Sequence, residues 1–348
     1  MSTDIQNNKS RIAILDPLRG LAALSVMWFH FTNGGHLLDA GGTVNEWLKL
    51  SGKYGWAGVE FFFVISGFVL PYALFAGNYR LQHFGTFLVK RLIRLEPPYI
   101  ASLLLIIALL FLGQFVPGYQ GEKFTMDWAR FFLHFGYLNS YFGYESYNPV
   151  YWTLAIELQF YFCIALLFPL LVREKLLGRI FVPAIFLLLS TIPSRADVIF
   201  RYLPLFTLGI LCFQYFSGMI SKRLWYLLTA IATAFALASL NLTAAIAGTL
   251  AALAIGISKD MNFEAIKTAL VWRTLSWAGA ISYSLYLLHV PIGGRVVNIG
   301  QRFASNSMES LLTLLLAVVV SMFSAWLLYR LVEKPSQRYS ASLKFNAE

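Results

Sequence analysis

Ten apolar runs follow one another along this chain, and they limit its possible folds more than any other feature of the sequence. A helix that crosses a bilayer needs about 20 mostly apolar residues. Of the 348 residues, 58% are apolar and 13% are charged. A soluble core cannot cover so much apolar surface, but lipid can. The sequence therefore predicts an all-α polytopic membrane protein, a bundle of about ten transmembrane helices over residues 12–32, 56–76, 98–117, 150–171, 179–193, 198–216, 224–240, 242–257, 272–292 and 311–331.

The basic residues give this bundle an orientation, because Lys and Arg gather on the cytoplasmic side of membrane proteins. With a cytoplasmic N-terminus and alternating spans, 18 of the 27 Lys and Arg residues lie in inner segments and eight in outer segments. Fusing 224–240 with 242–257 would move the basic residues that follow to the outside. We therefore expect two spans that separate near Asn241, and both termini in the cytoplasm.

Charge, cysteine content and motifs exclude several classes of function. The net charge of +10 comes from short loops between apolar runs, which indicates membrane topology rather than nucleic-acid binding. Cys163 and Cys212 lie inside apolar runs, so no structural disulfide is expected. The histidines lack metal-ligand spacing and no P-loop, GxGxxG or HExxH pattern occurs, so we expect no metal and no permanently bound cofactor. We expect one membrane domain over 1–348, without a cleavable signal peptide or a fused soluble domain.

The first span carries two ionisable residues, Arg19 and His30, that the bilayer should not tolerate without a reason. Eleven residues correspond to about 20° of net rotation and about 16 Å of helix, so both side chains share one face. Ala23 and Val26 lie between them and are small enough to leave a groove. One interpretation is an anion held by Arg19 below a titratable base. The alternative is that Arg19 snorkels to the headgroups and His30 only stabilises helix packing.

Two acidic residues lie in other spans. Glu60 is near the outer end of the second span, where it is either interfacial or functional, and Ser66 with Gly67 forms a small pair that allows close helix approach. Glu157 lies about 12 Å inside the fourth span. A carboxylate at that depth must be paired or protonated. Because His30 is at a compatible depth, we expect Glu157 to pair with His30. The alternative is a purely structural ion pair.

Two further segments carry polar groups at useful spacing. Residues 84–95 predict an amphipathic helix, with Lys90, Arg91 and Arg94 on one face, that ends at Pro97-Pro98 before the third span begins. This face is either a phosphate-binding patch or a topological signal. In the ninth span, Tyr286 and His289 are i,i+3 neighbours near the outer end, where they are either functional or part of an aromatic belt.

Taken in order, six blocks of the sequence resemble the acyltransferase type 3 family of integral membrane acyltransferases. These blocks are LDPLRGLAALSVMWFH, GVEFFFVISGF, KRLIR, YWTLAIELQFY, SYSLYLLHVPI and VEKPS, and they span residues 11 to 336. The resemblance implies a ten-helix core in the bacterial cytoplasmic (inner) membrane. Such a core moves an acyl group, commonly acetyl, from cytoplasmic acyl-CoA to a hydroxyl of a surface polysaccharide or a lipid-linked glycan.

The resemblance also implies roles for single residues. Arg19 and His30 match the family's arginine–histidine pair, Arg91 and Arg94 match its RxxR motif, and Glu157 matches the carboxylate of its Trp-Ser/Thr-Glu block. The chain departs from the pattern in two places: Leu158 stands where the family often has a second acid, and Glu60 stands where it often has Asp. Some relatives carry a fused esterase-like domain, which we do not expect here.

These observations combine into one hypothesis. His30 and Glu157 are expected to be catalytic, with His30 as general base or transient acyl acceptor, and acyl-CoA (acetyl-CoA) is the expected co-substrate at Arg19, Arg91 and Arg94. The expected acceptor site comprises Glu60, Ser66, Trp152, Tyr286 and His289. The expected partners are a sugar or lipid-linked glycan and membrane lipids, and no nucleic acid. The alternatives are a transporter of a small anion and an inactive relative that acts in assembly. The acceptor hydroxyl, the acyl chain and the oligomeric state stay open.

Overall fold

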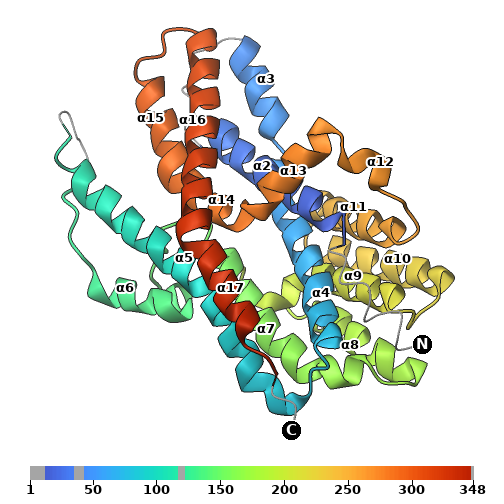
Figure 1. Cartoon of the computed structure of the whole chain (residues 1–348). Coiled ribbons are helices and arrows are strands. Elements are labelled where there is room, and N and C mark those ends of the chain that lie inside the picture. Colours follow the sequence, from blue (N-terminus) through green and yellow to red (C-terminus); the bar gives the residue numbers. More distant parts are fainter. Residues whose placement is uncertain (1–11, 35–42, 117–121, 346–348) are drawn as a thin grey trace.

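The computed structural model describes residues 12–34, 43–116 and 122–345, and all regular secondary structure in these ranges is helical (Figure 1). The first half of the chain forms α2 (Leu15–Asn33), α3 (Thr43–Gly52), η1 (Gly55–Ala57), α4 (Gly58–Ala76), η2 (Leu81–His83), α5 (Phe84–Gly113), α6 (Trp128–Leu133), η3 (His134–Gly136), η4 (Asn139–Phe142) and α7 (Trp152–Leu171). The second half forms α8 (Leu176–Leu189), η5 (Ile199–Tyr202), α9 (Leu203–Phe216), α10 (Lys222–Ser239), α11 (Leu242–Ser258), α12 (Glu264–Lys267), α13 (Leu270–Ala280), α14 (Ser282–Leu288), η6 (His289–Gly294), α15 (Arg295–Gln301), α16 (Ser307–Leu328), η7 (Tyr329–Glu333) and α17 (Lys334–Ser342).

The expected all-helical membrane architecture is confirmed by the length and composition of these helices. Five helical segments are long and apolar enough to cross a membrane: Glu46–Ala76, Leu81–Gly113, Trp152–Leu171, Ile199–Phe216 and Ser307–Ser342. Leu176–Leu189 and Leu242–Ser258 are shorter apolar helices. The count of ten spans and the cytoplasmic position of the termini stay predictions.

The expected separation near Asn241 is confirmed. The Asn241 side chain accepts a hydrogen bond from the backbone N–H of Ala244 at 2.9 Å, and it thereby caps the start of α11. The predicted single span over 272–292 is wrong in detail. Its helix is interrupted at Ile281, between α13 and α14, and it then continues into the π-helical turn η6.

The predicted helix end at Pro97-Pro98 is wrong, because α5 runs without interruption from Phe84 to Gly113. A proline inside a helix removes one backbone hydrogen bond, but neighbouring helices can stabilise the segment. Here Tyr99, directly after the two prolines, is fully buried, and the Tyr283 hydroxyl donates to the Leu95 carbonyl at 3.0 Å. The basic face of residues 84–95 and the third predicted span therefore form one rigid helix.

Two pairs of helices pack with their backbones in contact through glycine. A Cβ added at Gly20 of α2 would lie 2.0 Å from the Leu275 carbonyl oxygen of α13. A Cβ at Gly279 of α13 would lie 1.9 Å from the Asp16 carbonyl oxygen of α2. The expected close approach at Gly67 is also confirmed, because a Cβ there would lie 2.2 Å from the Phe206 carbonyl oxygen of α9. These contacts fix α2 and α4, which carry site residues.

Candidate active site

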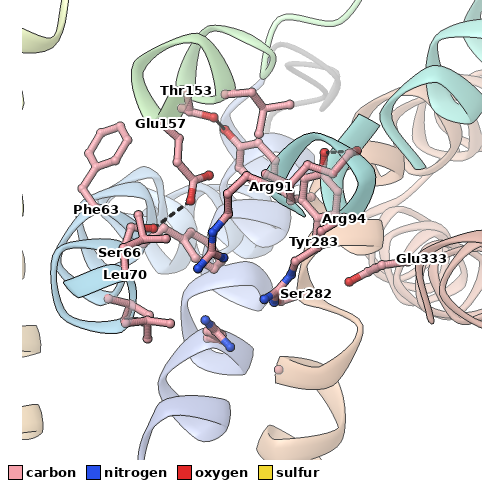
Figure 2. A pocket seen from close by; sticks show the side chains of 18 of the residues that line it. Phe63, Ser66, Leu70, Arg91, Arg94, Thr153, Glu157, Ser282, Tyr283 and Glu333 are labelled. Atoms are coloured by element: carbon pink, nitrogen blue, oxygen red, sulfur yellow. Dashed lines mark hydrogen bonds between the residues drawn. The ribbon is translucent and has the colours of Figure 1, made fainter. Parts of the chain in front are cut away.

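A cavity of about 170 Å³ lies where α2, α4, α5, α7, α14 and η7 meet. Ser66 of α4 and Glu157 of α7 line one side of it, and Arg91 and Arg94 of α5 reach into it from the other, as Figure 2 shows. Arg19 of α2 also lines the cavity. With Tyr286 of α14, six of the ten predicted site residues, from five helices, thus come together around one space.

The three arginines give the cavity one cationic end. Arg91 and Arg94 are i,i+3 neighbours on α5, and the Arg91 guanidinium lies 5.8 Å from the centroid of the Tyr161 ring on α7. Arg19 lies 3.9 Å from Asp16, one turn earlier on α2. Guanidinium groups suit phosphate because their planar fork can donate two parallel hydrogen bonds. This end of the cavity can therefore bind an anion.

A second, larger cavity adjoins the arginine end. It has a volume of about 590 Å³ and shares Arg91, Arg94 and Gln337 with the first cavity. Lys90 and Lys344 add two cationic side chains to its wall. The end of α17 and the residue after it close one side, because the Ser340 hydroxyl donates to the Lys90 carbonyl at 2.7 Å and the Lys90 ammonium donates to the Leu343 carbonyl. The two cavities together form a basic entrance that narrows toward Glu157.

Glu157 does not pair with His30, so this expectation is wrong. Its Oε1 atom instead accepts a hydrogen bond from the Ser66 hydroxyl at 2.9 Å, and the carboxylate interacts electrostatically with Arg91. The depth along each helix was compatible with pairing, but the two side chains belong to different environments. Glu157 lines the cavity, whereas His30 is not among its lining residues.

His30 lies against a second histidine, His289, at the start of η6. The His289 Nε2 atom is 3.2 Å from the His30 Nδ1 atom. Each Nδ1 atom also lies next to a backbone carbonyl of its own helix, Val26 at 2.9 Å for His30 and Leu285 at 3.0 Å for His289. Because a carbonyl oxygen only accepts, each neutral ring carries its proton on Nδ1. His289 Nε2 then accepts from His30 Nδ1–H, and the lone pair of His30 is on Nε2.

Tyr286 stands between the cavity and this histidine pair. Its hydroxyl shares a 2.8 Å hydrogen bond with the Thr153 hydroxyl, and both residues line the cavity. Its ring centroid lies 5.8 Å from that of His289. Thr153 is eight residues before Tyr161 on α7, so this end lies about 12 Å from the arginine end. The cavity and the histidine pair are therefore neighbours separated by one aromatic side chain.

The remaining predicted residues lie near this end but outside the cavity lining. Glu60 is buried, and its Oε2 atom has no hydrogen-bond partner. Trp152 is 38% exposed and packs its ring at 5.6 Å from that of Tyr202. Their assignment to acceptor binding stays a prediction.

Glu333 is a cavity residue that sequence reasoning missed. It ends the π-helical turn η7 and is 3% exposed. Its Oε2 atom accepts from the Ser284 hydroxyl at 2.5 Å, and its Oε1 atom accepts from the Gln337 amide at 2.8 Å. The available signal was an acidic residue at the end of an apolar run, in the block VEKPS. Its partner Ser284 cannot be identified from spacing. π-helical turns often occur at functional sites, and here one carries His289 and the other Glu333.

Comparison with known proteins identifies the family of the chain. The chain is 27% identical over 324 residues to nodulation protein 10 of Rhizobium leguminosarum bv. viciae, which covers 82% of this chain and 84% of the relative. No solved structure matches the chain. Residues 12–330 match the acyltransferase domain that defines the acyltransferase type 3 family. This match covers nearly all of the described helices, including every residue of the predicted site, and the chain therefore belongs to the acyltransferase type 3 family of membrane acyltransferases.

Proposed function

We propose that the chain transfers an acyl group, acetyl in the first instance, from acyl-CoA to a hydroxyl of a surface polysaccharide or lipid-linked glycan in the bacterial cytoplasmic membrane. One observation carries the proposal. A cavity leads from three arginines, past a serine–glutamate pair, to a tyrosine that adjoins two hydrogen-bonded histidines. Cations for an anionic donor and a base for a hydroxyl acceptor thus occur at opposite ends of one path.

The basic entrance suits coenzyme A. The nucleotide part of CoA carries a diphosphate and a 3′-phosphate, and Lys90, Lys344, Arg91 and Arg94 surround the larger cavity. The smaller cavity is narrow and lies inside the bundle, as the uncharged pantetheine arm requires. The thioester would then lie near Ser66 and Glu157, where exclusion of water protects it from hydrolysis.

His30 supplies the base for the acceptor. Its Nε2 lone pair accepts the proton of the acceptor hydroxyl, while Nδ1–H keeps its hydrogen bond to His289 Nε2. The charge that develops on the imidazole is stabilised by this bond and by the Val26 carbonyl. Tyr286 must turn aside for the acyl group to reach the acceptor, because it separates the two parts of the site.

The experiment uses the full chain purified into lipid nanodiscs. Acetyl-CoA is added with and without a glycan extract, and the released CoA thiol and the mass of the glycans are followed. We expect thiol release that depends on the glycan, and a mass gain of one acetyl group on a sugar. His30→Ala should abolish both, whereas Ser324→Ala, whose hydroxyl only bonds its own helix, should be as active as the wild type. If the chain in vesicles instead lets a small anion cross the membrane without any CoA release, the result would support a transporter.

A further inference from the structure

We propose that Ser66 carries the acyl group as a covalent ester between donor and acceptor, with Glu157 as the group that takes and returns its proton. This inference rests on the proposed acyl-CoA donor. The cavity that would hold the thioester contains Ser66 and Glu157, while the histidine pair lies beyond Tyr286. An ester on Ser66 would hold the acyl group between these two places.

The hydrogen bond of Ser66 is unlike that of most hydroxyls in the helices of this chain. A buried helical serine or threonine commonly donates to a carbonyl one turn earlier in its own helix. Ser324, Ser336 and Thr249 do so, to Val320, Val332 and Ala245. The Ser66 hydroxyl instead donates across to Glu157 on α7 at 2.9 Å. A hydroxyl within hydrogen-bond reach of a fixed base is the arrangement that activates a serine nucleophile.

The surroundings of the pair suit an attack on a thioester. Ser66 is held in place by its neighbour Gly67, whose backbone contacts α9 directly. Arg91 interacts electrostatically with Glu157, and Arg91 and Arg19 line the same cavity. Guanidinium groups held in place beside a thioester stabilise the negative charge that develops on its carbonyl oxygen. The serine, the base and the cations thus come from α4, α7, α5 and α2.

The two half-reactions balance as follows. In the first, Ser66 Oγ attacks the thioester carbonyl carbon, Glu157 takes the hydroxyl proton, and the carbon–sulfur bond breaks. CoA leaves as a thiolate and is protonated in the cytoplasm. In the second, the acceptor oxygen attacks the ester carbonyl carbon and His30 Nε2 takes its proton. The carbon–Oγ bond breaks, Ser66 Oγ recovers the proton from Glu157, and His30 releases its proton to water.

The test looks for the ester directly. The full chain in nanodiscs is mixed with radiolabelled acetyl-CoA without glycan, quenched in acid and analysed by intact-protein and peptide mass spectrometry. We expect about one acetyl group per chain on the peptide that contains Ser66, together with a burst of CoA thiol of the same size. Added glycan should remove the label.

Variants decide the result where the ester is too short-lived to see. Ser66→Ala should lower glycan acetylation by at least about 1,000-fold, while acetyl-CoA binding and the thermal midpoint stay near those of the wild type. Ser66→Cys should give a thioester adduct, and Ser324→Ala is the matched control. If Ser66→Ala transfers acetyl at the wild-type rate, or if the label is on another residue, the proposal is wrong while the transferase function stands. If the wild type neither releases CoA nor acetylates glycan, the transferase function itself fails.

Discussion

The histidine pair makes a quantitative prediction about His289. Replacing His289 by Leu removes one of the two acceptors of His30 Nδ1–H, the other being the Val26 carbonyl, and keeps a side chain of similar size in a site that is 1% exposed. A hydrogen bond to a charged group contributes about 1.5–3 kcal/mol. The Nδ1–Nε2 distance of 3.2 Å is at the long end of the normal range, so we take the lower value. Since about 1.4 kcal/mol corresponds to a factor of ten, the chemical step should slow about 10-fold.

The assay is single-turnover acetyl transfer to glycan, with acetyl-CoA affinity measured on the same nanodiscs. Acetyl-CoA affinity should not change, because His289 is not among the cavity-lining residues. His289→Gln should recover much of the rate, because its amide oxygen can accept the same hydrogen bond. His30→Ala removes the base itself and should cost about 100- to 10,000-fold.

Two results would refute this reasoning. A His289→Leu protein with the wild-type rate would show that the pair has no part in catalysis. A His289→Leu protein as inactive as His30→Ala, with an unchanged thermal midpoint, would show that His289 acts on the substrate itself rather than through His30.

Three further predictions test other parts of the molecule. The double variant Arg91→Ala, Arg94→Ala should weaken acetyl-CoA binding at least about 10-fold, as measured by titration calorimetry, and leave glycan binding intact. Unchanged acetyl-CoA affinity would show that the two arginines serve only as a topological signal. Gly279→Val should lower the thermal midpoint or abolish folding, because its Cβ would meet the Asp16 carbonyl. Gly85→Ala is the control and should be tolerated, because its Cβ would meet open space. Equal stability of the two variants would contradict the α2–α13 packing. Burial lowers the pKa of His134 below its usual value of 6.5, and its Nε2 atom accepts from the Tyr147 N–H. The folded loop thus favours neutral His134, and the loop should lose stability as the pH falls below about 6.5. Limited proteolysis within 122–149 should therefore be faster at pH 5 than at pH 7.5. Equal cleavage at the two pH values would contradict this role of His134.

Local signals in the sequence were sufficient for much of the helical framework. The cap at Asn241 is a short-range interaction, and it separated α10 from α11 as predicted. The apolar runs located α2, α4 and α7, because burial in lipid or protein depends on composition over about 20 residues. The helix end predicted at Pro97-Pro98 could not be judged from local signals. Whether a proline ends a helix depends on what packs around it, and buried neighbours of α5 are not visible in the local sequence.

Six of the residues that line the cavity could be predicted from the sequence, but their contacts could not. Position along a span gives depth, and depth placed Glu157 and His30 together. The partner of a side chain also depends on the rotation and neighbours of its helix, and these placed Glu157 against Ser66 and His30 against His289. The π-helical turns at His289 and Glu333 shift the register of their helices. Because such turns depend on tertiary packing, no periodic pattern in the sequence predicts them.

The hydrogen bond between Thr153 and Tyr286 has a consequence for the electrical behaviour of the membrane. A cell maintains a voltage across its membrane, and moving one charge through 100 mV corresponds to about 2.3 kcal/mol. A water-filled path from the basic entrance to the far side would dissipate that voltage. The cavity ends at Tyr286, whose neighbours Val26, Leu287 and Leu288 are buried in the same apolar cluster. The chain should therefore insulate the bilayer while Tyr286 keeps this position, and planar bilayers that contain the chain without substrate should show no ionic conductance.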